Sequence, residues 1–208
     1  MKLLVSGATT TIRRHINHGN LGQLITPRDR NAPIRGMAYA ADNSAYSDWN
    51  EPAFMRMLDK IQGYEQKPLF VAVPDFVGNA RISSKLFDIW APEIIDRGLP
   101  AAYVLQDGQG GVCVPWGDIS ALFIGGSTAF KSCDHVRYLV KKANRKGIWV
   151  HMGRVNSYQR LQVAMDMGVD SVDGSGYSRF AELKLAKALN YLQMEQGALE
   201  LNKYLLVA

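Results

Sequence analysis

Residues 157–173 read SYQRLQVAMDMGVDSVD and join a helix, a glycine and a strand in one short unit. Ser157 is a suitable N-cap for a helix in which apolar residues recur on one face. Gly168 follows this helix at the place where a residue with positive φ closes the last turn. The apolar run Val169–Val172 then predicts a buried strand. The unit is typical of a helix that returns the chain to a parallel sheet.

The same order of helix, glycine and strand recurs along the chain, with Gly98 and Gly147 in the position of Gly168. The apolar runs predict strands at Leu3–Ser6, Met37–Ala41, Leu69–Val73, Ala101–Gln106, Ala121–Ile124, Ile148–Met152 and Val169–Val172. Helices are predicted after Asn50, Asn79, Asp134, Ser157 and Ser178, and the second of them is expected to bend at Pro92. Their predicted apolar faces are Phe54, Leu58 and Ile61; Ile82, Leu86, Ile89 and Trp90; Val136, Leu139, Val140 and Ala143; Leu161, Ala164 and Met165; and Leu183, Ala186, Leu189 and Leu192.

Stacked βα units form either a closed barrel or an open doubly wound sheet. The pattern predicts an α/β fold, a compact (β/α)8-type barrel that occupies residues 1–208 as one domain. The segment Asp107–Ser120 is too short and too rich in glycine for a full helix between two strands. One outer helix of the barrel is therefore expected to be missing or shortened there.

The composition of the chain is that of an ordinary globular protein. The chain has 208 residues, a formal net charge of +5 and 47% hydrophobic residues, which is ordinary globular usage. No apolar run approaches the roughly 20 residues that cross a bilayer, and the first residues do not resemble a signal peptide. Only two cysteines occur, Cys113 and Cys133, so no disulfide framework is expected. We expect a cytoplasmic protein with no membrane partner, no cofactor and no metal site, and leave its oligomeric state open.

Polar residues gather where the predicted strands end, which is where βα folds place their chemistry. In chain order these ends carry Asp42, Asp75, Gln106, Gly125 with Gly126, the segment 151–154, and Asp173. Two carboxylates that converge on one substrate can divide the work of nucleophile and proton carrier, as in retaining glycoside cleavage. A further Asp and a Gln suit the edge of a purine-like base, and Tyr46 and Met152 suit its two faces. Glycosidic chemistry on a nucleobase is predicted.

These motifs, over about two-thirds of the chain from Asp42 to Gly176, resemble the tRNA-guanine transglycosylase superfamily, which includes DNA 7-deazaguanine transglycosylases. The resemblance implies that Asp173 is the nucleophile and that Asp42 handles the proton on the base. It implies roles in binding the base for Asp75, Gln106, Gly125, Gly126, Tyr46 and Met152. The matching segments are 42–46, Asp75, Gln106, 124–126, 152–153 and 164–173, in the order of the family.

The chain also departs from the tRNA enzymes of that superfamily. It has no Cys-rich zinc segment near its C-terminus, it is shorter, and Ser44 and Ala45 stand where those enzymes favour glycine. The departures favour the DNA branch. The expected partners are DNA, with tRNA as the alternative, and a free 7-deazaguanine base as co-substrate.

Two segments concentrate positive charge. From Thr11 to Arg35 five arginines accompany one acid, and from Lys131 to Lys146 six basic residues accompany one acid. The first segment is predicted to be a loop, and the second to be a helix face in contact with solvent. The candidate phosphate-binding residues are Arg13, Arg14, Arg28, Arg30, Arg154 and Arg179.

Other functions remain open from the residues alone. Water in place of the incoming base would make the protein an N-glycosidic hydrolase. A barrel without catalysis could bind a nucleobase or nucleic acid, although such a binder does not need both Asp42 and Asp173. A different phosphate-binding barrel could use the Gly125-Gly126 loop, but no lysine is predicted at a strand end for Schiff-base chemistry.

Overall fold

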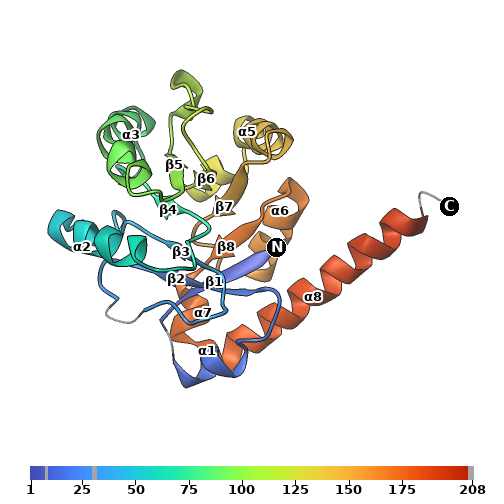
Figure 1. Ribbon diagram of the computed structural model, residues 1–208. Helices are drawn as coiled ribbons and strands as arrows, with labels where there is room; N and C mark the ends of the chain where they lie inside the picture. Colours follow the sequence, from blue (N-terminus) through green and yellow to red (C-terminus); the bar gives the residue numbers. More distant parts are fainter. Residues whose placement is uncertain (8, 30–31, 206–208) are drawn as a thin grey trace.

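The computed structural model describes residues 1–7, 9–29 and 32–205, and within them eight parallel strands close into a barrel. Each strand pairs with the next one in the chain, and the last pairs with the first (Figure 1). The strands are β1 (Lys2–Ser6), β2 (Leu21–Ile25), β3 (Tyr39–Ala41), β4 (Val71–Ala72), β5 (Ala101–Leu105), β6 (Ala121–Ile124), β7 (Trp149–Met152) and β8 (Ser171–Asp173). The closed barrel is confirmed, and the open doubly wound sheet is excluded.

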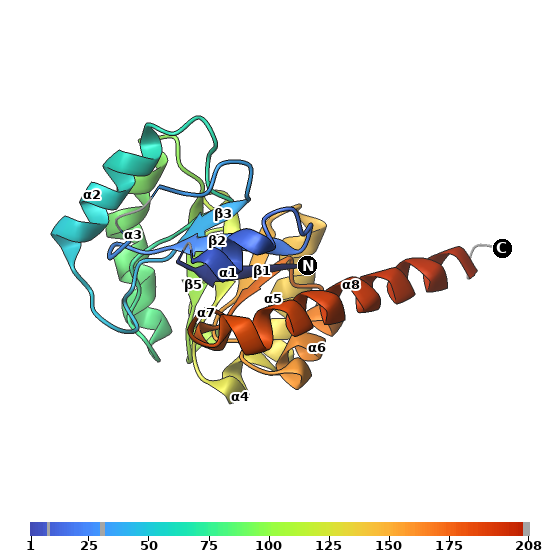
Figure 2. The same cartoon turned by 90° about the horizontal axis from the view of Figure 1, so that it is seen from below.

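Helices surround this barrel, and the last one extends well beyond it (Figure 2). They are α1 (Thr10–Arg14), α2 (Glu51–Gln62), α3 (Ala80–Ile95), α4 (Thr128–Lys131), α5 (Asp134–Arg145), α6 (Tyr158–Met167), α7 (Ser175–Arg179) and α8 (Ala181–Leu205). The predicted caps Asn50, Asn79 and Ser157 each accept a hydrogen bond from a backbone N–H of the first turn. Gly98, Gly147 and Gly168 have φ of 66°, 68° and 79°, as their position after a helix predicts.

The expected gap in the outer layer is confirmed. Between β5 and β6 the chain forms only a short 3-10 turn, η1 (Gln109–Gly111). The described residues between β2 and β3 also form no helix, which the sequence did not indicate. The barrel is therefore thinly covered at two places in its circumference.

Strand β2 was not predicted, and the expectation of a loop from Thr11 to Arg35 is wrong. Gly22 and Gln23 interrupt the apolar pattern of this strand, but both have structural reasons. A Cβ on Gly22 would lie 2.5 Å from Leu4 Cδ2, so β1 approaches too closely for any side chain. Gln23 is buried, donates to the Gly7 carbonyl at 3.1 Å and accepts from the Ile34 N–H at 2.8 Å.

Two predicted helix faces are only partly right: Leu189 and Leu192 of α8 are buried and Trp90 of α3 packs against the core, but other members of both faces are exposed. In α3, Ile82 and Ile89 are 38% and 62% exposed, while Phe87 and Ile94 are buried against the barrel, and the helix continues through Pro92 to Ile95. In α8, which begins at Ala181 rather than after Ser178, Leu183 is 70% exposed and Leu185 is buried. Apolar residues occupy more than one face of both helices, so spacing alone did not identify the packed face.

The strands separate two apolar layers because successive side chains point to opposite faces. Leu3 and Val5 belong to the layer between strands and helices, whereas Leu4 points into the barrel. The barrel interior is filled by Leu4, Leu24, Ala40, Phe70, Ala72, Ala102, Val104, Ala121 and Phe123. This packing closes the barrel below its C-terminal mouth, so a ligand can enter only from that end. Every helix in the described part of the chain is too short or too polar to span a bilayer.

Candidate active site

A cavity of about 350 Å³ lies at the mouth of the barrel, where the strands end. Its floor is apolar and includes Leu4, Leu24, Ala72, Val104 and Phe123. The predicted site residues that line it are Asp42, Tyr46, Asp75, Gln106, Gly125, Gly126, Arg154, Asp173 and Arg179. Its volume is at the lower end of the range for small-molecule sites. An apolar floor under a polar rim suits a flat heterocycle with polar edges.

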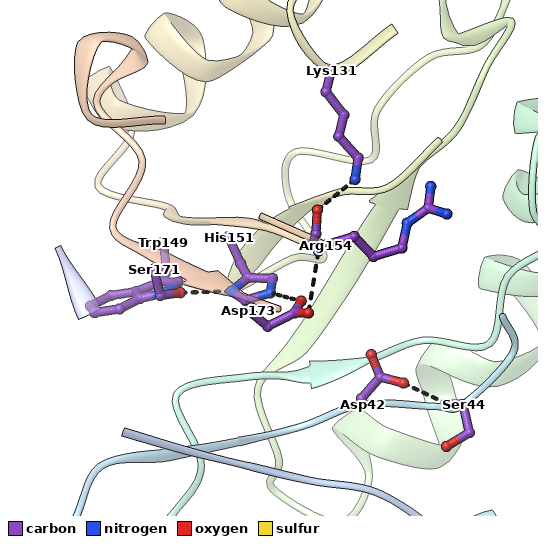
Figure 3. A network of polar contacts seen from close by, with 9 residues as sticks. Asp42, Ser44, Lys131, Trp149, His151, Arg154, Ser171 and Asp173 are labelled. Carbon is purple, nitrogen blue, oxygen red and sulfur yellow. Dashed lines mark hydrogen bonds and ion pairs between the residues drawn. The ribbon is translucent and has the colours of Figure 1, made fainter. Parts of the chain in front are cut away.

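Asp42 lies after β3 and faces the same open space as Asp173 (Figure 3). Desolvation by burial raises the pKa of Asp42 to about 7, and the negative charges of Asp173 and Asp75 add to this increase. The Ser44 N–H donates to Asp42 Oδ1 at 2.6 Å, which opposes the increase and fixes the carboxyl group. Ser44 has φ of 62°, a conformation that glycine adopts more easily. Asp42 can therefore both hold and release a proton near neutral pH.

Asp75 and Gln106 form a connected pair on the opposite rim from Asp173. Asp75 accepts from Gln106 Nε2 at 2.6 Å and from Asn43 Nδ2 at 2.8 Å. Burial raises the pKa of Asp75, although these two hydrogen bonds oppose the effect. Gln106 Oε1 in turn accepts from the Gly78 N–H at 2.9 Å, which fixes the orientation of the amide. The pair presents a carboxyl and an amide in a fixed arrangement.

The two glycines after β6 make room for this pair and for Asp107. A Cβ on Gly125 would lie 2.6 Å from Gln106 Nε2, and one on Gly126 would lie 2.8 Å from Asp107 Oδ2. The sequence predicted that the Gly125 N–H would contact a ligand, but this N–H already donates to the Leu105 carbonyl at 3.0 Å. Gly126 is the glycine of this loop that can offer its N–H to the pocket.

Asp173 is held by two N–H donors (Figure 3). His151 Nε2 lies 3.0 Å from Asp173 Oδ2, and the Arg154 N–H donates to Asp173 Oδ1 at 3.2 Å. Trp149 Nε1 donates to Ser171 Oγ at 2.8 Å, and Ser171 Oγ lies 2.9 Å from His151 Nδ1. An ionised carboxylate only accepts, so a neutral His151 carries its proton on Nε2 and accepts from the Ser171 hydroxyl on Nδ1.

His151 was given no role from the sequence, and Met152 was expected in its place. His151 is fully buried, with its ring 4.6 Å from that of Phe123 and 4.9 Å from that of Phe70. Met152, the next residue of β7, points to the helix layer and does not line the pocket. The prediction that Met152 forms a wall for the base is therefore wrong, because alternate residues of a strand face opposite sides. That alternation was the signal that could have found His151.

Tyr46 lies at the mouth with 67% of its surface exposed. The Arg154 guanidinium lies over its ring, 4.4 Å from the centroid, and Arg154 Nη2 donates to the Gly126 carbonyl at 2.5 Å. Arg154 also has φ of 59°, an uncommon conformation for a residue other than glycine. This arginine thus spans the mouth from the β3 loop to the β6 loop.

Lys131 also lines the pocket, and the sequence did not indicate this, since Lys131 lies in α4 rather than at a strand end. It is buried, and its Nζ donates to the Gly153 carbonyl at 2.5 Å. Burial lowers the pKa of Lys131 to about 8, and the charges of Arg154 and Arg160 contribute in the same direction.

Three of the predicted phosphate-binding arginines, Arg13, Arg14 and Arg28, do not line the pocket. Arg13 and Arg14 lie in α1, and Arg14 pairs with Glu182 of α8 at 3.5 Å. Arg28 pairs with Asp48 at 2.5 Å, and Arg30 lies outside the described residues. Among the described members of the predicted set, Arg154 and Arg179 reach the mouth.

Among the described residues, no group of three or more His, Cys, Asp and Glu side chains is arranged to hold a metal ion. No protein-family model matches this sequence, and no curated protein matches it.

Proposed function

We propose that this protein is a pentosyltransferase that replaces guanine in DNA with a 7-deazaguanine base through a covalent bond between Asp173 and the sugar. One observation carries the proposal. A carboxylate held by two N–H donors, Asp173, and a carboxyl with a pKa of about 7, Asp42, line one cavity together with the Asp75–Gln106 pair. These are the groups that exchange at a glycosidic bond requires.

The first half of the exchange breaks the bond between the sugar and guanine. The target nucleotide turns out of the helix, and its base enters the cavity. An oxygen of Asp173 forms a bond to the anomeric carbon while the carbon–N9 bond breaks, and the electron pair of that bond moves to the base. Asp42, protonated in part at neutral pH, gives the departing base its proton. The products are free guanine and a sugar–Asp173 ester.

The second half restores the glycosidic bond. The incoming 7-deazaguanine gives its N9 proton to Asp42, which the first half left ionised. N9 then forms a bond to the anomeric carbon as the bond to Asp173 breaks, and the electron pair returns to the carboxylate. Both carboxyl groups recover their starting states, so the cycle needs no cofactor.

The base-binding rim supports a guanine-like substrate. Guanine offers neighbouring N–H donors on one edge, which suit the Asp75 carboxyl, and a carbonyl oxygen, which suits an amide or backbone N–H. Asp75 and Gln106 are already held by Asn43 and Gly78, so little ordering is required when a base binds.

The test is incorporation of labelled guanine into nucleic acid. The purified protein is incubated with labelled guanine and either DNA or unmodified tRNA, and the label in the polymer is counted. We expect incorporation into DNA, none with Asp173→Asn, and an unchanged rate with Asp88→Asn, which alters an exposed carboxylate of α3. Circular dichroism and thermal unfolding check that both variants fold.

The same experiment separates the alternatives. Incorporation of the label into tRNA alone would show that the substrate is tRNA rather than DNA. Release of unlabelled guanine without incorporation would identify a hydrolase. Binding of nucleic acid with neither event, in the wild-type protein, would contradict enzymatic function and leave a binding barrel.

A further inference from the structure

A second cavity, of about 310 Å³, lies next to the active-site pocket and is lined by residues of α4, α6 and the end of β7. Lys131 and Arg154 line both cavities, so the two are neighbours. The polar residues of the second cavity are Thr128, Lys131, Ser132, Arg154, Gln159 and Arg160. The described residues that line it thus include three cations, two hydroxyls and an amide, and no carboxylate.

The three cations are satisfied by neutral oxygens. Arg160 donates to Thr128 Oγ1 at 3.2 Å and to the Arg154 carbonyl at 3.4 Å. Lys131 and Arg154 donate to backbone carbonyls, those of Gly153 and Gly126. Within the described residues, none of the three forms an ion pair with a carboxylate. An ammonium has three N–H donors and a guanidinium five, so each has donors left for a ligand.

The Lys131 ammonium is repelled by the guanidinium groups of Arg154 and Arg160. Burial lowers the pKa of Lys131 to about 8, the charges of Arg154 and Arg160 act in the same direction, and the charges of Asp173 and Asp107 oppose them. An anion in the cavity would reverse this repulsion, because opposite charges at short range favour the charged form of each group.

We propose that this cavity is a phosphate-binding site that receives the phosphate attached to the nucleotide in the active site. The geometry gives the order of the groups. The Asp75–Gln106 pair follows β4 and β5, and Asp173 lies at the end of β8. Arg154, whose backbone N–H donates to Asp173, also lines the second cavity. A nucleotide whose base contacts Asp75 and whose anomeric carbon contacts Asp173 would extend its phosphate toward Arg160.

The assignment of the phosphate to a nucleotide rests on the proposed function, whereas the affinity for phosphate does not. A phosphodiester of nucleic acid and the phosphate of a free nucleotide share the same chemistry. Both offer unesterified oxygens that accept charge-assisted hydrogen bonds from arginine and lysine. The test therefore needs one arm for each source.

The first measurement uses inorganic phosphate alone with the full chain, and its binding is followed by the line width of the 31P signal. We expect saturable binding, weakened about tenfold or more by Arg160→Gln. Arg145→Gln is the matched control, since Arg145 is exposed at the end of α5, just before β7 begins and so at the far end of the barrel. Equal binding to the wild type and to Arg160→Gln would overturn the phosphate site.

The second measurement compares deoxyguanosine, deoxyguanosine 5′-monophosphate and a trinucleotide with a central guanine by calorimetry. The site predicts at least about tenfold tighter binding when a phosphate is present, and a loss of this gain in Arg160→Gln but not in Arg145→Gln. Replacing the flanking phosphodiesters of the trinucleotide by neutral methylphosphonates distinguishes the two sources. If this replacement weakens binding, the site takes a phosphate of the nucleic-acid backbone. If only the monophosphate binds more tightly than the nucleoside, the site takes the phosphate of a free nucleotide. Equal affinity for nucleoside and nucleotides would overturn the proposal.

The two proposals can fail separately. Phosphate binding that depends on Arg160, without any base exchange, would remove the proposed function and retain the anion site. Base exchange without such binding would retain the function and remove this site.

Discussion

The carboxylate of Asp173 is oriented by a chain of side chains that ends at Trp149. His151 is the link that touches the carboxylate, and its full burial fixes the ring between Phe70 and Phe123. In the proposed exchange, hydrogen-bond donors would stabilise this carboxylate both before it attacks the sugar and when it leaves. His151 is therefore a positioning residue that acts through Asp173.

Removing this donor should slow the exchange while the fold persists. We expect His151→Phe, which retains an aromatic ring, to lower kcat by about 10- to 100-fold, the usual value of a hydrogen bond to a charged group. His151→Gln keeps an N–H near the position of Nε2 and should recover much of the rate. The readout is single-turnover kinetics together with the amount of covalent intermediate trapped on denaturing gels. Equal losses in both variants would indicate that His151 serves packing alone.

The tautomer of His151 can be measured without any assay of activity. The four histidines of the chain allow long-range 15N–1H spectra to be assigned by substitution. We expect neutral His151 to carry its proton on Nε2. A proton on Nδ1 would contradict the hydrogen-bond chain from Ser171.

Asp42 makes stability depend on pH, because its pKa is raised from 3.8 to about 7 in the folded protein. The folded state keeps this proton to a higher pH than the unfolded state, so the free energy of unfolding falls as pH rises from about 4 to about 7. Asp42→Asn removes that loss. We expect the variant to match the wild type near pH 4 and to be about 1–3 kcal/mol more stable at pH 8, since the open pocket screens part of the penalty.

Urea unfolding at the two pH values measures this difference. The same variant should have lost base exchange, so stability and activity would change in opposite directions. A variant that is destabilised at pH 8 would show that the Asp42 carboxylate is not costly in the folded protein.

At the scale of the elements, α3, α5 and α6 are each followed by a glycine with positive φ, and these glycines differ in their surroundings. A Cβ on Gly147 would meet nothing within 4 Å, whereas a Cβ on Gly168 would lie 2.8 Å from Asn144 Nδ2. That amide donates to the Gly168 carbonyl at 3.0 Å and joins α5 to the end of α6. The two positions share a positive φ and differ in packing.

Alanine at these positions should therefore have unequal costs. We expect Gly147→Ala to destabilise the protein by about 1 kcal/mol through its backbone conformation alone. Gly168→Ala should cost about 2–3 kcal/mol, because it also displaces Asn144. Thermal or urea unfolding of the two variants measures the difference. Equal losses would show that the link through Asn144 contributes nothing.

At the scale of the whole molecule, charge is divided across the mouth of the barrel. Asp42 and Asp75 follow β3 and β4, while Lys131, Arg154, Arg160 and Arg179 follow β6, β7 and β8. These four cations form an arc near Asp173, the proposed nucleophile. A nucleic acid would be held by this arc rather than by the N-terminal arginines, of which Arg14 and Arg28 are paired with acids.

Affinity for DNA should therefore depend on salt. Three to four phosphate contacts predict that binding weakens by about 40- to 150-fold between 50 and 200 mM salt. Arg160→Gln should reduce the slope of log K against log salt by about one, and Arg14→Gln should leave it unchanged. Fluorescence anisotropy with a labelled oligonucleotide measures both slopes. A response to salt that is flat in the wild type would contradict nucleic acid as the partner.

The sequence by itself determined the local features of this protein. Helix caps, the glycines after helices and the order of strands and helices depend on neighbours in the chain, so Asn50, Asn79, Ser157 and Gly168 were read correctly. The strand ends predicted that Asp42, Asp75, Gln106 and Asp173 would meet, because the C-terminal ends of parallel strands share one edge of the barrel.

The tertiary structure alone decided what depends on contacts between distant segments. Strand β2 was not predicted because Gly22 and Gln23 interrupt its apolar pattern. Their presence in the strand is explained by contacts with Leu4, Gly7 and Ile34, which lie elsewhere in the chain. His151 lies behind Asp173, Lys131 lines the pocket and Met152 does not, because the direction of a side chain depends on how its strand or helix is turned against the barrel. Caps and turns depend on interactions among a few neighbouring residues, so the sequence predicts them. Burial and contacts between charges arise only once the barrel has closed.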